Sequence, residues 1–188
     1  MKKIAIFASG SGSNAQNIIE YFKGNRNVIV DSLWSNSEDA YALIRAERLG
    51  VETFTFSRDE LYNSVDVLEE LSERKIDMIV LAGFLWLVPR SLTEEFTIIN
   101  IHPALLPKYG GKGMYGNYVH EAVIKNKDKE SGITIHYVNQ NYDEGNIIFQ
   151  ATCDVEPKDT PESLAQKVHQ LEYEHFPRII EEVALGEE

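Results

Sequence analysis

Asp77-Met78-Ile79-Val80-Leu81-Ala82 decides the fold class, because five of its six residues are apolar. A strand of this composition is typical of the centre of a parallel sheet that has helices on both faces. Short apolar runs alternate with amphipathic stretches on either side of it. This alternation predicts right-handed crossovers and an α/β fold, with a doubly wound, mostly parallel, Rossmann-like sheet in a three-layer α/β/α arrangement. The expected strands are residues 3–8, 28–34, 53–56, 77–82, 97–101, 132–138 and 147–155, and the expected helices are 14–22, 38–49, 61–74, 118–126 and one that begins at Thr160-Pro161-Glu162.

Length and composition narrow the functional classes. A chain of 188 residues predicts a single domain, residues 1–188, with an ordinary soluble composition of 43% hydrophobic and 26% charged residues. The apolar run 78–88 is too short to cross a membrane, and no signal-peptide core follows Met1-Lys2-Lys3. Together with the single Cys153, this predicts a cytoplasmic protein. The expected oligomeric state is a monomer or a homodimer, and the sequence does not decide between them. The net charge of −12 argues against nucleic acid as a partner.

A glycine-rich turn, Gly10-Ser11-Gly12-Ser13-Asn14, lies between the first expected strand and the first helix. Backbone N–H groups and the positive end of a helix dipole at such a turn can bind an anion, which indicates a phosphate monoester on a small substrate. The turn lacks the third glycine of a dinucleotide fingerprint and the lysine of a Walker A loop. The alternative interpretation is a plain turn in which Ser13 caps the helix.

Asn100 and His102 end the fifth expected strand, where ligands bind in open α/β sheets. Residues two apart on a strand point to the same side, so an amide and an imidazole converge there. Such a pair can polarise a carbonyl group and move a proton. The alternative is a structural histidine, but the long Pro- and Gly-containing loop 103–116 that follows favours a functional site.

Asp143-Glu144-Gly145 follows the strand that contains His136. Asp and Gly are ordinary turn residues, which is one interpretation. In the other, the Asp143 carboxylate orients His102 and favours its imidazolium form. His136 shares a strand face with Thr134 and is a second, weaker candidate. The histidines and Cys153 show no metal-binding spacing, so no metal is expected, and no Gly-x-Ser-x-Gly elbow indicates a serine hydrolase.

Taken together, these motifs resemble the phosphoribosylglycinamide formyltransferase family, the folate-dependent enzymes of purine synthesis. The resemblance covers nearly the whole chain, and its most specific element is the Asn-x-His-Pro-x-Leu-Leu-Pro motif at residues 100–107. It also includes residues 8–14, 81–84 and 132–145. The chain departs from the family at residues 85–88, where Met-Arg-Ile-Leu is common, and at Gly110, where many members have proline.

The resemblance implies transfer of a formyl group from 10-formyltetrahydrofolate to the amine of N1-(5-phospho-D-ribosyl)glycinamide through a tetrahedral intermediate. Asn100 would bind the formyl oxygen, His102 would act as general acid, and Asp143 would orient His102. The acceptor's phosphate would contact Gly12, Ser13 and Asn14, and its ribose hydroxyls would contact Glu172. The implied folate contacts are Arg58, Leu85, Trp86, Leu87, Val88, Asn100, Gln140, Asn141, Tyr142 and Asp143.

Loop position also suggests Lys108 and Lys112 as ligands for the folate glutamate tail. Two alternatives stay open: a formyltransferase that acts on an amino-sugar nucleotide, and a non-catalytic folate or nucleotide sensor. A methionyl-tRNA formyltransferase would be expected to carry an extra C-terminal domain, and a formyltetrahydrofolate hydrolase an extra N-terminal one.

Overall fold

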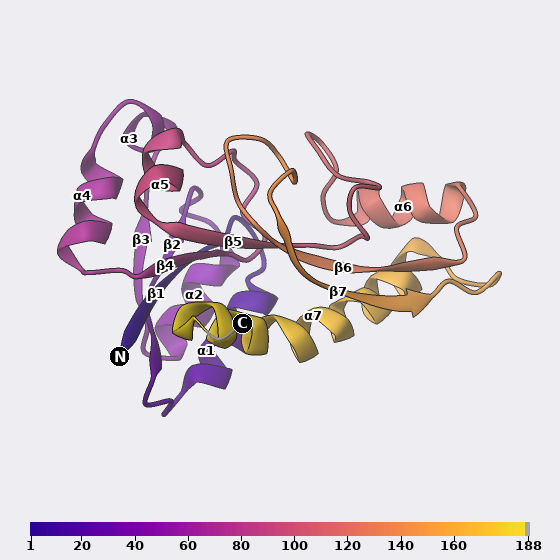
Figure 1. The fold of residues 1–188 in the computed structure, drawn as a ribbon, viewed down its shortest axis with the longest axis horizontal. Helices are drawn as coiled ribbons and strands as arrows, with labels where there is room; N and C mark the ends of the chain where they lie inside the picture. Colours follow the sequence, from indigo (N-terminus) through magenta and orange to yellow (C-terminus); the bar gives the residue numbers. More distant parts are fainter. Residues whose placement is uncertain (187–188) are drawn as a thin grey trace.

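A computed structural model describes residues 1–186 and contains one seven-stranded sheet with the order β3-β2-β1-β4-β5-β6-β7 (Figure 1). Strands β1 to β5 are parallel, whereas β6 and β7 are antiparallel to their neighbours. The strands are β1 (Lys2–Phe7), β2 (Val28–Ser35), β3 (Glu52–Thr55), β4 (Met78–Leu81), β5 (Thr97–His102), β6 (Glu130–Tyr137) and β7 (Ile147–Asp154). The mostly parallel, doubly wound α/β fold is therefore confirmed.

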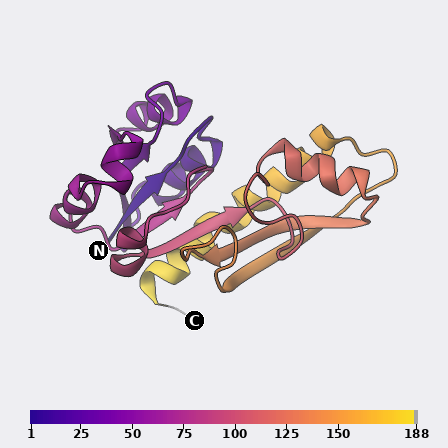
Figure 2. The same cartoon turned by 90° about the horizontal axis from the view of Figure 1, so that it is seen from above.

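Helices cover both faces of the sheet and form two hydrophobic cores. Ile6 and Phe176 belong to the core under α1 (Ser13–Phe22), α2 (Tyr41–Arg48), α6 (Asn117–Lys125) and α7 (Pro161–Leu185). Phe7 and Ile79 belong to the core on the opposite face, under α3 (Arg58–Tyr62), α4 (Asp66–Glu73) and α5 (Arg90–Glu95). All four of these side chains are fully buried. Figures 1 and 2 show β5 connecting the N-terminal half of the molecule to the long β6–β7 pair and the helices beside it.

The structure differs from the expected elements or alternatives in three places. The predicted helix 61–74 is two helices: α3 ends at Tyr62, and α4 begins at Asp66 with Val65 as its N-cap, while the Asp66 N–H donates to the Ser64 hydroxyl at 3.0 Å. Helix α5 was not expected, since only one of its six residues is buried. The alternative in which Ser13 caps α1 is wrong, because Gly12 is the N-cap and no side chain caps that helix. The predicted start of α7 is confirmed, with Thr160 as its N-cap.

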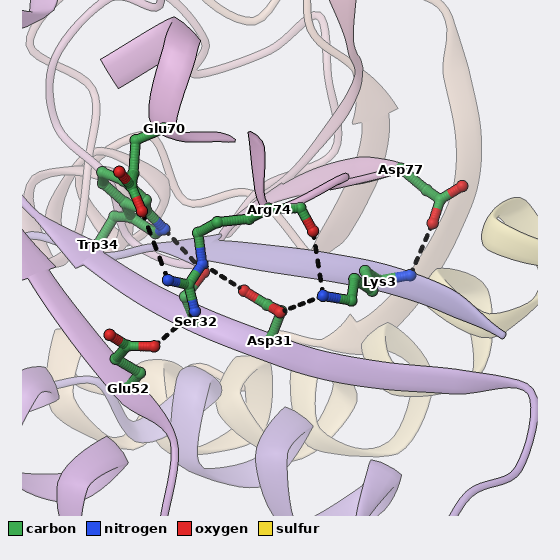
Figure 3. Close-up of polar contacts among 8 residues, drawn as sticks. All are labelled: Lys3, Asp31, Ser32, Trp34, Glu52, Glu70, Arg74 and Asp77. Carbon is green, nitrogen blue, oxygen red and sulfur yellow. Dashed lines mark hydrogen bonds and ion pairs between the residues drawn. The ribbon is translucent and has the colours of Figure 1, made fainter. Parts of the chain in front are cut away.

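An ion-pair network holds the amino-terminal edge of the sheet together (Figure 3). Asp31 on β2 accepts hydrogen bonds from Lys3 Nζ at 2.9 Å and Arg74 Nε at 2.7 Å, and Arg74 also pairs with Glu52 at 2.6 Å. Burial raises the pKa of the Asp31 carboxyl, but the hydrogen bonds from Lys3 and Arg74 outweigh it and hold that pKa below its ordinary value. The network joins three strands and α4 at the end of the sheet away from the loops that follow β1, β4 and β5.

None of the helices within residues 1–186 combines the length and the apolar composition needed to cross a membrane.

Candidate active site

A cavity of about 560 Å³ lies at the carboxyl ends of β1, β4 and β5. Its walls come from the turn after β1, the segment after β4, loop 103–116, α6, the turn after β6 and α7. Nine of the residues predicted for the site line it: Gly12, Ser13, Asn14, Leu85, Asn100, His102, Tyr142, Asp143 and Glu172. The structure does not bring the other predicted residues to this cavity: Arg58, Trp86, Leu87, Val88, Gln140 and Asn141.

One wall of the cavity is the start of α1. Gly12 has a left-handed backbone (φ 72°), and a Cβ there would lie 2.5 Å from Ala42, so only glycine allows this close approach. The first turn of α1 contains no acidic residue and no side-chain cap. Its N–H groups, from Ser13 onward, therefore suit a phosphate.

Asn100 is held in place by a histidine on the neighbouring strand. The antiparallel register pairs Asn100 with His136, and Asn100 Nδ2 donates a hydrogen bond to His136 Nε2 at 3.2 Å. His136 Nδ1–H donates to the Tyr137 carbonyl at 2.8 Å, which leaves Nε2 as an acceptor. The second N–H of the Asn100 amide remains for a ligand in the cavity. His136, the weaker of the candidates predicted from the sequence, thus orients the Asn100 amide.

His102 is buried between a backbone carbonyl and a carboxylate. Its Nε2–H donates to the Tyr109 carbonyl at 2.7 Å, and its Nδ1 lies 3.6 Å from Asp143 Oδ2. Burial lowers the pKa of the imidazole below its ordinary value, although Asp143 and the Tyr109 carbonyl act in the opposite direction. The expected effect of Asp143 is therefore present, but burial outweighs it. His102 is neutral at neutral pH in the unliganded protein.

The turn after β6 places Asp143. Asp143 has a left-handed backbone (φ 55°), and its Oδ2 accepts a hydrogen bond from the Gly111 N–H at 2.9 Å. A Cβ on Gly145 would overlap the Tyr137 carbonyl, so glycine is required there. Burial raises the pKa of Asp143, but His136, His102 and the Gly111 N–H together hold it below its ordinary value. Asp143 is thus an anion at neutral pH.

Glu172 on α7 forms the far corner of the cavity. This carboxylate is only 4% exposed, and its Oε2 accepts hydrogen bonds from Asn14 Nδ2 at 2.9 Å and His169 Nδ1 at 2.8 Å. The hydrogen bond to Glu172 raises the pKa of the His169 imidazole. In this arrangement the Asn14 side chain holds Glu172, so the phosphate site of α1 consists mainly of backbone N–H groups.

Sequence reasoning missed three groups of the site. His120 and His169 line the cavity, and the Tyr109 carbonyl binds His102. His169 precedes Glu172 by three residues on a predicted helix, and that spacing is a signal that could have placed them together. The position of His120 on α6 carried no comparable signal.

The remaining predicted folate contacts lie outside the cavity: Arg58 lines one separate depression, Gln140 and Asn141 line another, and Val88 is buried in the core. The Arg58 guanidinium packs over the rings of Tyr62 and Trp86, each with its centroid 5.4 Å away. Lys112 lines the cavity, whereas Lys108 lines a separate depression and lies 3.7 Å from Asp128. The structure thus favours Lys112 over Lys108 as a group that meets a ligand. Among residues 1–186, no set of three or more His, Cys, Asp or Glu side chains is arranged to hold a metal ion.

Comparison with known proteins gives consistent results. Residues 2–180 match the family model described as formyl transferase. The chain is similar to the chloroplastic phosphoribosylglycinamide formyltransferase of Arabidopsis thaliana (39% identity, 95% of this chain and 64% of that protein). It is also similar to the phosphoribosylglycinamide formyltransferase of Haemophilus influenzae (35% identity, 96% of this chain and 86% of that protein). The crystal structure of glycinamide ribonucleotide transformylase 1 from Symbiobacterium toebii superimposes with a TM-score of 0.89 at 32% identity, covering 99% of this chain and 89% of that one. The chain spans less than two thirds of the length of the chloroplastic relatives.

Proposed function

The chain belongs to the formyl transferase family, and we propose from this that it transfers the formyl group of 10-formyltetrahydrofolate to the amine of N1-(5-phospho-D-ribosyl)glycinamide. The products are the N-formyl acceptor and tetrahydrofolate, and the reaction is a step of de novo purine biosynthesis. The names of the similar proteins support this acceptor, as does the uncapped start of α1, which suits a phosphate.

The observation that carries the proposal is the convergence of Asn100, His102 and Asp143 on one cavity that also contains the start of α1. When the amine nitrogen attacks the formyl carbon, negative charge develops on the formyl oxygen. The N–H of Asn100 that His136 does not use donates to this oxygen. Because the amide is already oriented, little reorganisation is needed when the charge appears.

The charge state of His102 determines where the proton of the attacking amine goes. The attacking amine becomes positively charged and must lose a proton, and neutral His102 accepts it. The resulting imidazolium stabilises the tetrahedral intermediate and is itself stabilised by Asp143. His102 then gives the proton to N10 of the folate as the carbon–nitrogen bond breaks, so the imidazole ends neutral. For these transfers Nε2 must leave the Tyr109 carbonyl, and the imidazole must carry its own proton on Nδ1, facing Asp143, so that Nε2 accepts the amine proton and later releases it.

Fewer observations support the proposed folate end of the site. Leu85 and Tyr142 line the cavity and offer apolar and aromatic surface to a pterin ring. Lys112, also on the cavity, is the proposed partner of the glutamate tail. Arg58, Trp86, Gln140 and Asn141 lie outside this cavity and would meet only the outer part of the folate.

The direct test mixes the purified protein with the proposed acceptor and 10-formyltetrahydrofolate and follows the formylated product. Turnover by the wild-type protein, lost in His102→Ala, is the expected result. Folate binding without product would overturn the acceptor, and amino-sugar nucleotides would then be tested as acceptors. A protein that binds folate and acts on neither acceptor class would be a sensor, contrary to the proposal.

A further inference from the structure

His120 on α6 is a buried histidine without a hydrogen-bond partner. The residue is 2% exposed and lines the cavity, and its Nδ1 is buried with no partner. Its Nε2 likewise makes no hydrogen bond to any atom of residues 1–186. Because this nitrogen, unlike Nδ1, is not fully buried, it faces the cavity that His120 lines. Buried polar side chains nearly always have partners, so an imidazole left free beside a ligand cavity indicates that the ligand supplies one.

The start of α6 lies beside this imidazole. The helix is capped by Gly116 without a side-chain hydrogen bond, and its first turn has no acidic residue. Gly116 and Asn117 line the same cavity as His120. The first N–H groups of α6 and the imidazole therefore present hydrogen-bonding groups to one region of the cavity.

One further group in this region lacks a hydrogen-bond donor. Glu172 lines the cavity and accepts both of its hydrogen bonds at Oε2, so its Oε1 has no donor among residues 1–186. A carboxylate oxygen accepts only, so a ligand that satisfies it must carry a donor.

The charge of the region selects the ligand chemistry. Burial, together with the nearby His169, lowers the pKa of His120, so its imidazole is neutral and offers one donor and one acceptor. The Glu172 carboxylate disfavours an anion beside it. A hydroxyl group, which both donates and accepts, fits a neutral imidazole, an N–H group and a carboxylate at once.

We propose that His120 binds the ribosyl hydroxyls of the acceptor together with Glu172, and that it makes the enzyme select a ribosyl over a deoxyribosyl acceptor. The proposal rests on the proposed function and adds a specificity-determining residue to it. A site built to hydrogen-bond a hydroxyl discriminates strongly against a substrate that lacks it, because its own polar groups are then left unpaired.

The test uses His120→Leu and His120→Gln with the ribosyl acceptor and with analogues that lack the 2- or the 3-hydroxyl. In His120→Leu, KM for the ribosyl acceptor should rise about tenfold or more, while KM for the folate and kcat stay near the wild-type values. His120→Gln, which keeps a donor and an acceptor, should recover part of the loss. Against one of the two deoxy analogues, wild type and His120→Leu should perform alike, because the interaction removed from the protein is already missing from the substrate.

Thermal unfolding separates this role from a packing role. Leucine removes the buried, unpartnered Nδ1 of His120, so the melting temperature of His120→Leu should equal or exceed that of the wild type. His175→Gln is the matched control, since His175 packs against Phe149 and does not line the cavity. Its KM values should not change.

Two results would overturn the inference. One is an unchanged acceptor KM in His120→Leu. The other is an equal loss against the ribosyl acceptor and both deoxy analogues. If the wild type itself does not turn over the ribosyl acceptor, the proposed function has failed instead, so the two failures are distinct.

Discussion

Asn100→Ala should affect catalysis and stability through two different N–H groups of one amide. One N–H is donated to His136 Nε2 at 3.2 Å, and the other is the proposed donor to the formyl oxygen. Loss of a donor of the second kind costs roughly 3–4 kcal/mol of transition-state stabilisation, so kcat should fall about 10²- to 10³-fold. Loss of the first leaves the acceptor of a 2% exposed histidine without its amide donor, which lowers the free energy of unfolding by about 1–3 kcal/mol.

The two effects are measured separately. Formyl transfer is followed by the appearance of tetrahydrofolate at a temperature well below unfolding, and stability is measured by thermal melting. At about 2–4 °C per kcal/mol, the melting temperature should fall by several degrees. Ile4→Val is the stability control. Ile4 is fully buried in the half of β1 away from the cavity, and its substitution costs about 0.5–1.5 kcal/mol. This control should keep the wild-type kcat.

If Asn100→Ala kept a kcat within about threefold of the wild type, which corresponds to less than ~1 kcal/mol, Asn100 would not be the donor to the formyl oxygen. The same conclusion would hold if Ile4→Val lost as much kcat as Asn100→Ala, since the loss would then reflect stability alone.

Three further predictions follow from the turn after β6, the ion-pair network and the charge of His102. Gly145→Ala forces a Cβ into a backbone carbonyl, so the turn that carries Asp143 must shift; the melting temperature and kcat should both fall, and a wild-type kcat would contradict this. Asp31→Asn removes the carboxylate that binds Arg74, at a cost of about 1.5–3 kcal/mol at pH 7. Because the folded pKa of Asp31 is depressed, urea unfolding should show this difference above about pH 4 and lose it as the pH falls through the folded pKa. Since neutral His102 accepts the proton, kcat/KM should fall as the pH drops through a pKa below about 6.5, and Asp143→Asn should move this limb to lower pH; an unmoved limb would separate Asp143 from the titration.

The fold could be predicted from the sequence because its signals are local. The uniformly apolar run 77–82 and the alternation around it identify a central parallel strand and its helices. The break between α3 and α4 was missed because a continuous pattern of apolar residues spans it. There, the chain leaves helical geometry between Asn63, the C-cap of α3, and Val65, the N-cap of α4, and the pattern of apolar residues does not record that change.

The site was predictable where its residues share one strand or one turn. Asn100 and His102 lie two apart on β5, and strand geometry alone places them on one side. By contrast, the role proposed for His120 depends on its imidazole being buried and unpartnered. That property arises from the packing of α6 against α7 and the sheet. No spacing in the sequence contains that information.

The antiparallel pairing between β5 and β6 fixes the register of the two strands, but it leaves the length of the chain between them free to change. Because Asn100 faces His136 and His102 faces Thr134 across this pair, a one-residue slip of β6 would put an alternate side chain opposite each of them. Chain length between the two strands is far less constrained, since lengthening a loop costs little free energy. Insertions between residues 103 and 129 that leave the Tyr109 carbonyl in place can therefore reshape the rim of the cavity without moving Asn100 relative to His136. In this chain, the rim of the cavity can therefore change by insertion, whereas the pairing that orients Asn100 can change only by substitution.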